Sequence, residues 1–369
     1  MNRKTSALVL VSLLVFAGLA LLSGLFSGLV RLGWVIEGGS PVSPLIHGPL
    51  MINGFLGTLI SLERSAALEK KWAYAAPVCM AIATVILLLG IIVIAQWLYL
   101  VGAILLLLIL TYLYQLQKEM YHIIMAVGGA CLVTGNFLYL YGLPIYNIIV
   151  WWMGFLLLII FSERLELNRI MRPSQNVQYL FTGLVLFWLA GITLTYVDRY
   201  SGWAIASVAL ILQALWLFKY DIARRTIRST AWTRYSAVCL LIGYGWLVLA
   251  GLFGLWKGLP AAGPMYDAIL HMIFLGFVFS MIFAHAPVII PSLSGKDIPY
   301  HNYFYLPLIL LHSSLLIRIM GDLFWLPVIR KSGAHTNVLA ILLFLGGIGF
   351  QLVRNSLKKS RQLKAAEKS

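Results

Sequence analysis

Long apolar segments separated by short polar ones run along the whole chain. Most have about the length of roughly 20 residues that a helix needs to cross a bilayer. We therefore expect an all-α integral membrane protein with one membrane domain over residues 1–369. The pattern predicts twelve transmembrane helices, at 7–30, 46–67, 74–95, 97–116, 122–142, 144–163, 178–197, 203–219, 234–256, 267–290, 303–321 and 336–354.

Composition supports the bilayer and excludes other classes of protein. The chain is 61% hydrophobic and 11% charged, whereas soluble domains are about 45–50% apolar and about 25% charged. Its net charge is +15, but the basic residues cluster in short loops and form no continuous face for nucleic acid. Cys79, Cys131 and Cys239 are isolated in apolar segments and are interpreted as packing residues.

The distribution of basic residues predicts the orientation in the membrane. With the N-terminus inside, 21 of the 27 Lys and Arg fall on the inner side, as the positive-inside rule requires. Five fall outside, including Arg31, Arg330 and Lys331, and Arg318 lies within the eleventh helix. We expect a multi-pass protein of a bacterial-type inner membrane with both termini cytoplasmic.

A short motif recurs at an interval of four helices, each time in the second helix of a quartet. It predicts three pseudo-repeats of four helices, over about 1–119, 120–230 and 231–369. The motif is Gly54-Phe55 with Glu63-Arg64 in the second helix, Gly154-Phe155 with Glu163-Arg164 in the sixth, and Gly276-Phe277 with His285 in the tenth.

Two histidines are predicted at the same outer depth of the membrane. His47 and His271 each stand near the start of a helix that runs from outside to inside. Two imidazoles on facing helices suit the axial positions of a haem, and the small residues Gly48 and Gly276 would leave room for a planar ring. Spacing alone leaves haem, another metal and no ligand all open.

The neighbouring residues favour haem. The HGxxM motif from His47 to Met51 resembles subunit I of haem-copper oxidases, and the spacing from His271 through Leu275-Gly276 to Met281 is similar to the tenth helix of cbb-type oxidases. The resemblance implies a low-spin haem b held by His47 and His271. That family also has twelve helices in three quartets with the N-terminus inside.

Haem propionates need cationic partners near the membrane surface. Arg330-Lys331 is predicted in the outer loop between the last two helices, where the resemblance implies a basic pair for the propionates; the alternative is an ordinary solvated loop. Arg318 is a secondary propionate candidate, and its spacing to Asp322 also suits an ion pair within one helix.

The departures from the oxidase pattern argue against oxygen reduction. Ile269 stands where that family has a further histidine, and the sixth and seventh helices contain no histidine. We therefore predict one haem, no copper and no terminal oxidase, and we expect no enzyme. The spacing from His271 to Met281 also resembles the NnrS family of haem-binding membrane proteins, which implies a link to nitric oxide or nitrosative stress.

A second candidate site is predicted at the inner face, where Glu63, Glu163 and His285 end three parallel helices. They would hold a metal or relay protons; alternatively, the glutamates pair with basic residues and His285 packs beside Pro287. His312 lies in the middle of the eleventh helix and is interpreted as a buried histidine bonded to a carbonyl.

Three functions remain open from the sequence. The first is a haem protein for electron transfer or for handling nitric oxide, with a redox partner or a diatomic gas as ligand. The second is a permease for a small solute or a proton-coupled substrate. The third is an assembly partner of a respiratory complex.

Overall fold

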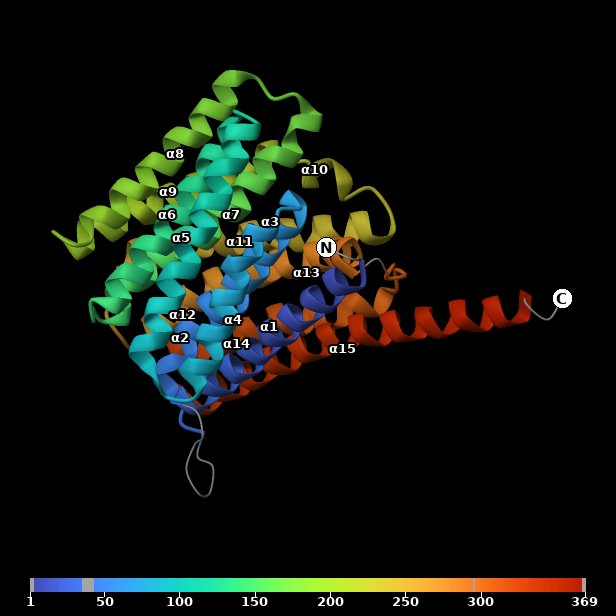
Figure 1. Ribbon diagram of the computed structural model, residues 1–369. Helices are drawn as coiled ribbons and strands as arrows, with labels where there is room; N and C mark the ends of the chain where they lie inside the picture. Colours follow the sequence, from blue (N-terminus) through green and yellow to red (C-terminus); the bar gives the residue numbers. More distant parts are fainter. Residues whose placement is uncertain (1–2, 35–42, 295, 367–369) are drawn as a thin grey trace. The chain divides into compact units, whose positions relative to one another are not determined.

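The computed structural model describes residues 3–34, 43–294 and 296–366, and in this part of the chain every regular element is helical (Figure 1). The structure confirms the prediction of twelve helices long and apolar enough to cross a membrane. The described chain divides into two compact units, Met1–Arg169 with Ser174–Tyr196, and Ile170–Pro173 with Val197–Ser369.

The first unit contains eight of the numbered helices. Its most buried span is Ile145–Met171, and Trp152 and Phe155 of this span are fully buried. The helices are α1 (Arg3–Arg31), α2 (His47–Pro49), α3 (Thr58–Leu68), α4 (Ala75–Leu88), α5 (Ile92–Leu116), α6 (Met120–Leu140), α7 (Ile145–Asn168) and α8 (Gln175–Leu194), with the short helices η1 (Pro44–Ile46), η2 (Leu50–Gly57) and η3 (Lys71–Tyr74).

The second unit includes most of the short helix η4 (Arg169–Met171) and continues after α8. Its helix α9 starts at an N-cap, where the Asp198 carboxylate accepts a hydrogen bond from the Tyr200 N–H at 3.0 Å. The helices are α9 (Arg199–Tyr220), α10 (Ala223–Thr226), α11 (Ala231–Lys257), α12 (Pro264–His271), α13 (Ser280–Ser294), α14 (Tyr305–Leu323) and α15 (Pro327–Ala366), with η5 (Met272–Phe279) and η6 (Asn302–Phe304).

Two spans contain a π-helical segment, one in each unit. In the first unit η2 continues α2 directly, and in the second η5 continues α12 directly. A π-helix bonds residue i to residue i+5, is rare, and occurs frequently at functional sites. Each π segment begins within three residues of a predicted haem ligand, His47 or His271.

The last helix begins earlier than the sequence predicted. Pro327 opens α15, so Arg330 and Lys331 lie in its first turns and the prediction of a loop there is wrong. Proline suits a first helical turn because its missing N–H would have no partner there. Figure 1 shows α15 continuing as one long helix towards the C-terminus.

Helices α14 and α15 pack with their backbones in contact at two glycines. A Cβ on Gly321 would lie 2.3 Å from the Arg330 backbone nitrogen, and a Cβ on Gly333 would lie 2.5 Å from that of Arg318. Each glycine therefore faces an arginine of the other helix. This close approach brings the Arg318 and Arg330 backbones to adjacent positions on the two helices.

Large apolar side chains remain exposed along the spans. Val15 is 64% exposed, Leu22 is 53% exposed and Leu186 is 62% exposed. Apolar exposure of this extent on a soluble protein would be a liability, but it suits helices that face lipid tails. These exposed apolar side chains indicate that the helices lie in a lipid bilayer.

Candidate functional site

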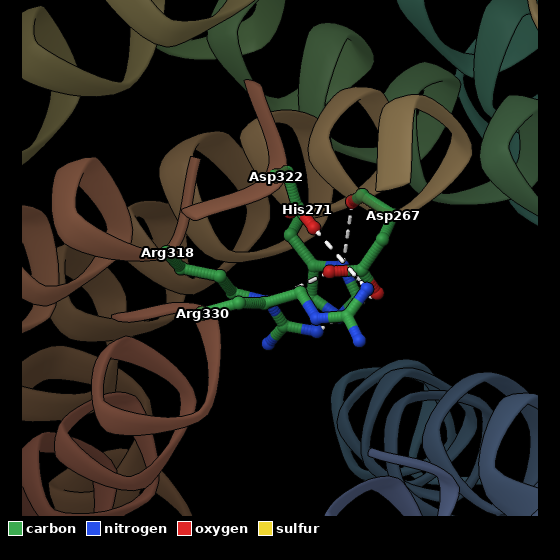
Figure 2. Close-up of polar contacts among 5 residues, drawn as sticks. All are labelled: Asp267, His271, Arg318, Asp322 and Arg330. Carbon is green, nitrogen blue, oxygen red and sulfur yellow. Dashed lines mark hydrogen bonds and ion pairs between the residues drawn. The ribbon is translucent and has the colours of Figure 1, made fainter. Parts of the chain in front are cut away.

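Figure 2 shows a cluster of five polar side chains in the second unit, Asp267, His271, Arg318, Asp322 and Arg330. His271 is the last residue of α12, and Asp267 lies one turn before it. Arg318 and Asp322 come from the end of α14, and Arg330 comes from the start of α15. Helix α12 thus supplies an imidazole and a carboxylate, α14 supplies a guanidinium and a carboxylate, and α15 supplies a guanidinium.

Arg318 binds Asp267 through two parallel hydrogen bonds. Its Nε donates to Oδ2 at 2.8 Å and its Nη2 donates to Oδ1 at 2.9 Å. Bidentate pairs of this kind fix orientation as well as adding energy. Asp267 is in turn 3.3 Å from Nδ1 of His271, so one carboxylate joins the arginine to the histidine.

Asp322 pairs with the other arginine. Its Oδ1 lies 3.6 Å from Nη1 of Arg330, and its side chain is fully buried. The ion pair between Asp322 and Arg318 that the spacing suggested is replaced by two pairs between helices. Nε of Arg330 has no hydrogen-bond partner among the described residues.

Each arginine of the cluster has an aspartate beside it, Asp267 beside Arg318 and Asp322 beside Arg330. Removing one partner of such a buried pair is costly because the other charge is left uncompensated. The aspartates therefore hold the two arginines in place. The Nε–H of Arg330 remains without a hydrogen-bond acceptor among the described residues.

The hydrogen bond of His271 identifies its tautomer. Nδ1 lies 2.8 Å from the Asp267 carbonyl oxygen, and because a carbonyl only accepts, Nδ1 must carry the proton. In the neutral ring Nε2 then carries the lone pair that a metal would need. Histidine ligands of metals are commonly oriented by such a bond from the other ring nitrogen.

His47 in the first unit has the same arrangement, supplied by a different helix. Its Nδ1 lies 2.7 Å from the Gly24 carbonyl oxygen of α1. The ring rests on this helix, because a Cβ on Gly28 would lie 3.0 Å from Nδ1. Met51 also packs on α1, and a Cβ on Gly24 would lie 2.7 Å from its sulfur.

The carbonyl bond does not by itself mark a ligand. His122 places Nδ1 2.9 Å from the Gln117 carbonyl oxygen, and His285 places Nδ1 2.8 Å from that of Met281. His271 differs from these two histidines in its neighbours, because Arg318 and Arg330 lie in the same cluster. His271 therefore shares its cluster with two arginines, each of which is paired with an aspartate.

The glycines expected to leave room for a planar ring contact tryptophans instead. A Cβ on Gly276 would lie 2.4 Å from the Trp246 ring, and a Cβ on Gly48 would lie 3.6 Å from the Trp152 ring. The space beside Gly276 is thus filled by an indole of α11. Gly276 is needed for helix packing, and the interpretation of an open space at this residue is wrong.

His312 is bonded to side chains, and the interpretation of a carbonyl bond is wrong. The Trp246 indole donates to Nδ1 of His312 at 2.9 Å, and Nε2 of His312 lies 3.4 Å from the Ser280 hydroxyl. Because an indole only donates, Nδ1 must accept, and the proton of the neutral ring is on Nε2. His312 therefore connects α11 and α14 to the end of the π segment η5.

The glutamates of the second candidate site meet at an arginine. Arg64 hydrogen-bonds Glu163 and lies 3.5 Å from Glu63, all within the first unit. His285 belongs to the second unit. Among the residues that the structure describes, no group of three or more His, Cys, Asp or Glu side chains is placed to hold a metal ion.

Sequence reasoning missed one member of the charged cluster. Asp267 contacts both His271 and Arg318, and its spacing of four residues to His271 on one helix was a usable signal. Lys331 is half-buried on α15 beside Arg330. The sequence contains no pattern that predicts the pairing of Asp267 with Arg318, because the two residues are far apart along the chain.

Comparison with known proteins places the chain in a family without assigning it an activity. No curated protein matches it. A family model described as a domain of unknown function (DUF8744) matches residues 10–350, which is most of the chain. This chain therefore belongs to the DUF8744 family.

Proposed function

We propose that this protein binds one low-spin haem b in the membrane, with His47 and His271 as axial ligands, and acts in electron transfer or in handling nitric oxide. The observation that carries the proposal is the meeting of His271 with Arg318 and Arg330 in one cluster. The sequence assigns these residues two complementary roles, His271 as an iron ligand and the arginines as propionate partners.

The chain's own residues have distinct tasks in this proposal. His47 and His271 are oriented by carbonyls that take their Nδ1 protons, which suits coordination through Nε2. Arg318 and Arg330, with Lys331 beside them, are candidates for binding propionates. Asp267 and Asp322 hold the two arginines in position.

A haem supplies one-electron chemistry, and two permanent histidine ligands favour electron transfer over gas binding. We infer no terminal oxidase activity, because Ile269 and the histidine-free sixth and seventh helices lack the ligands of an oxygen-reducing centre. The basic residues support an inner-membrane protein with both termini cytoplasmic. Its partner would be a redox protein or a diatomic gas.

The test is haem content in ligand variants, with histidine controls from the same units. Purified His47→Ala and His271→Ala are each expected to lose the sharp b-type signal of a reduced-minus-oxidised spectrum. His122→Ala and His285→Ala are matched controls, because each also removes a ring whose Nδ1 faces a carbonyl. Both controls are expected to keep the signal.

The spectrum also separates the competing functions. Equal haem content in all four variants would reject the proposed ligands. A protein without haem absorbance after expression with ample haem would favour a permease or an assembly partner instead.

A further inference from the structure

A buried network of uncharged side chains surrounds the π segment of the first unit. Asn53 lies within η2, and its Oδ1 accepts a hydrogen bond from Nδ2 of Asn136 on α6 at 2.8 Å. Asn136 Nδ2 also donates to the Tyr99 carbonyl at 3.0 Å, and its Oδ1 accepts from the Trp152 indole at 2.9 Å. Asn53 and Asn136 are both fully buried.

The donors of this network fix the orientation of both amides. An indole N–H only donates, so Trp152 requires the oxygen of Asn136 to face it, and the Asn136 amino group must then face Asn53. Asn53 must therefore accept this hydrogen bond with its side-chain oxygen. A flip of Asn53 would place two amino groups against each other, so its Nδ2 is forced to point elsewhere.

This forced orientation leaves a buried donor unused. Nδ2 of Asn53 has no hydrogen-bond partner among the described residues. A buried amide hydrogen without a partner is costly, and an ordered water or ion is one of the established explanations for such a group. Within a membrane span bulk water cannot fill this role.

A second unused group lies one turn further along. Thr58 follows η2 by one residue, is fully buried, and its Oγ1 has no hydrogen-bond partner in the part of the chain that the structure describes. Because π-helical bonds join residue i to residue i+5, Asn53 and Thr58 lie on the same face of this helix. The amide offers a donor, and the hydroxyl offers a donor and an acceptor.

We propose that Asn53 and Thr58 together bind one small, neutral, hydrogen-bonding ligand, a single water molecule, inside the first unit. The ligand must accept from Asn53 Nδ2, and it must be small because both side chains are fully buried. It must be neutral because the residues of the network carry no charge, and an unpaired ion there would be strongly disfavoured. This proposal does not depend on haem binding.

A double-mutant cycle on the purified full-length protein tests the shared ligand. Thr58→Val keeps the shape and removes the hydroxyl. If the two groups share a water, Thr58→Val lowers the Tm in the wild type and lowers it by much less in an Asn53→Leu background. Thr111→Val is the control, because the exposed Thr111 hydroxyl only bonds the Leu107 carbonyl of its own helix.

Two results would overturn the proposal. An unchanged or raised Tm in Thr58→Val would show that the hydroxyl has no bound partner, and an equal loss of Tm in both backgrounds would show that the groups share none. Should Asn53→Leu not fold, a wild-type cryo-EM map that resolves ordered waters decides the question. Density between Asn53 Nδ2 and Thr58 Oγ1 supports the site, and its absence rejects it.

Discussion

The two π-helical segments each follow a histidine, but different groups lie next to them. The segment after His47 is enclosed by amides, an indole and hydroxyls, with Asn53 and Asn136 at its centre. The segment after His271 follows a cluster of two aspartates and two arginines. The same local geometry therefore adjoins a neutral network in one unit and a cluster of charged side chains in the other.

This difference indicates a division of tasks. Ionisable groups in a membrane are rare and mark functional positions, and in the proposed function the His271 end is where the haem propionates bind. Neutral hydrogen bonds between membrane helices contribute modestly and mainly specify packing. In the proposed function, the neutral network beside the His47 segment therefore holds the helix that carries His47.

The largest effect is expected from breaking the charged cluster. Arg318→Met leaves the Asp267 carboxylate without its bidentate partner, and removing one member of a buried pair typically costs about 3–5 kcal/mol. We expect that loss in the free energy of unfolding, measured by denaturant titration in mixed micelles. The exposed Arg169, 3.8 Å from Glu166, is the control, and Arg169→Met should cost less than about 1 kcal/mol.

A rescue variant sharpens this prediction. Asp267→Leu combined with Arg318→Met removes both charges and should recover part of the lost stability. A double variant as unstable as the sum of its single variants would mean that the two side chains do not depend on each other.

An intermediate effect is expected where α14 and α15 touch. Gly321→Ala places a Cβ against the Arg330 backbone, which cannot move aside easily, and overpacking typically costs about 1–3 kcal/mol. Gly18→Ala is the control, because a Cβ there meets no atom within 4 Å. The same titration should show a loss for Gly321→Ala and no loss for Gly18→Ala; equal results would contradict the close approach.

The smallest effect is expected in the neutral network. Asn136→Leu removes hydrogen bonds to Asn53, Tyr99 and Trp152, and such bonds between membrane helices average about 0.6 kcal/mol each. We expect a loss of about 1–2 kcal/mol in the free energy of unfolding. A loss as large as that of Arg318→Met would contradict the contrast between the two regions.

The sequence predicted the number and approximate position of the spans, because apolar length alone decides them. The predicted start of the last helix was wrong, because charged residues such as Arg330 and Lys331 are typical of loops. In the structure Arg330 lies in the helix and pairs with Asp322. The π segments could not be predicted, because a run of apolar residues has no period that separates them from α-helix.

The sequence predicted individual residues of the candidate site but not the contacts between them. His271, Arg318 and Arg330 could be named individually from residue type and depth, and they prove to share one cluster. Their pairing with Asp267 and Asp322 depends on how α12, α14 and α15 pack. The network around Asn53 likewise depends on contacts between helices that are remote in sequence.

The most direct test of the central proposal is the reduced-minus-oxidised absorption spectrum of the wild-type protein, purified after expression with ample haem, together with its haem content. The proposal predicts a sharp low-spin b-type spectrum and one haem per chain. A featureless spectrum would contradict it.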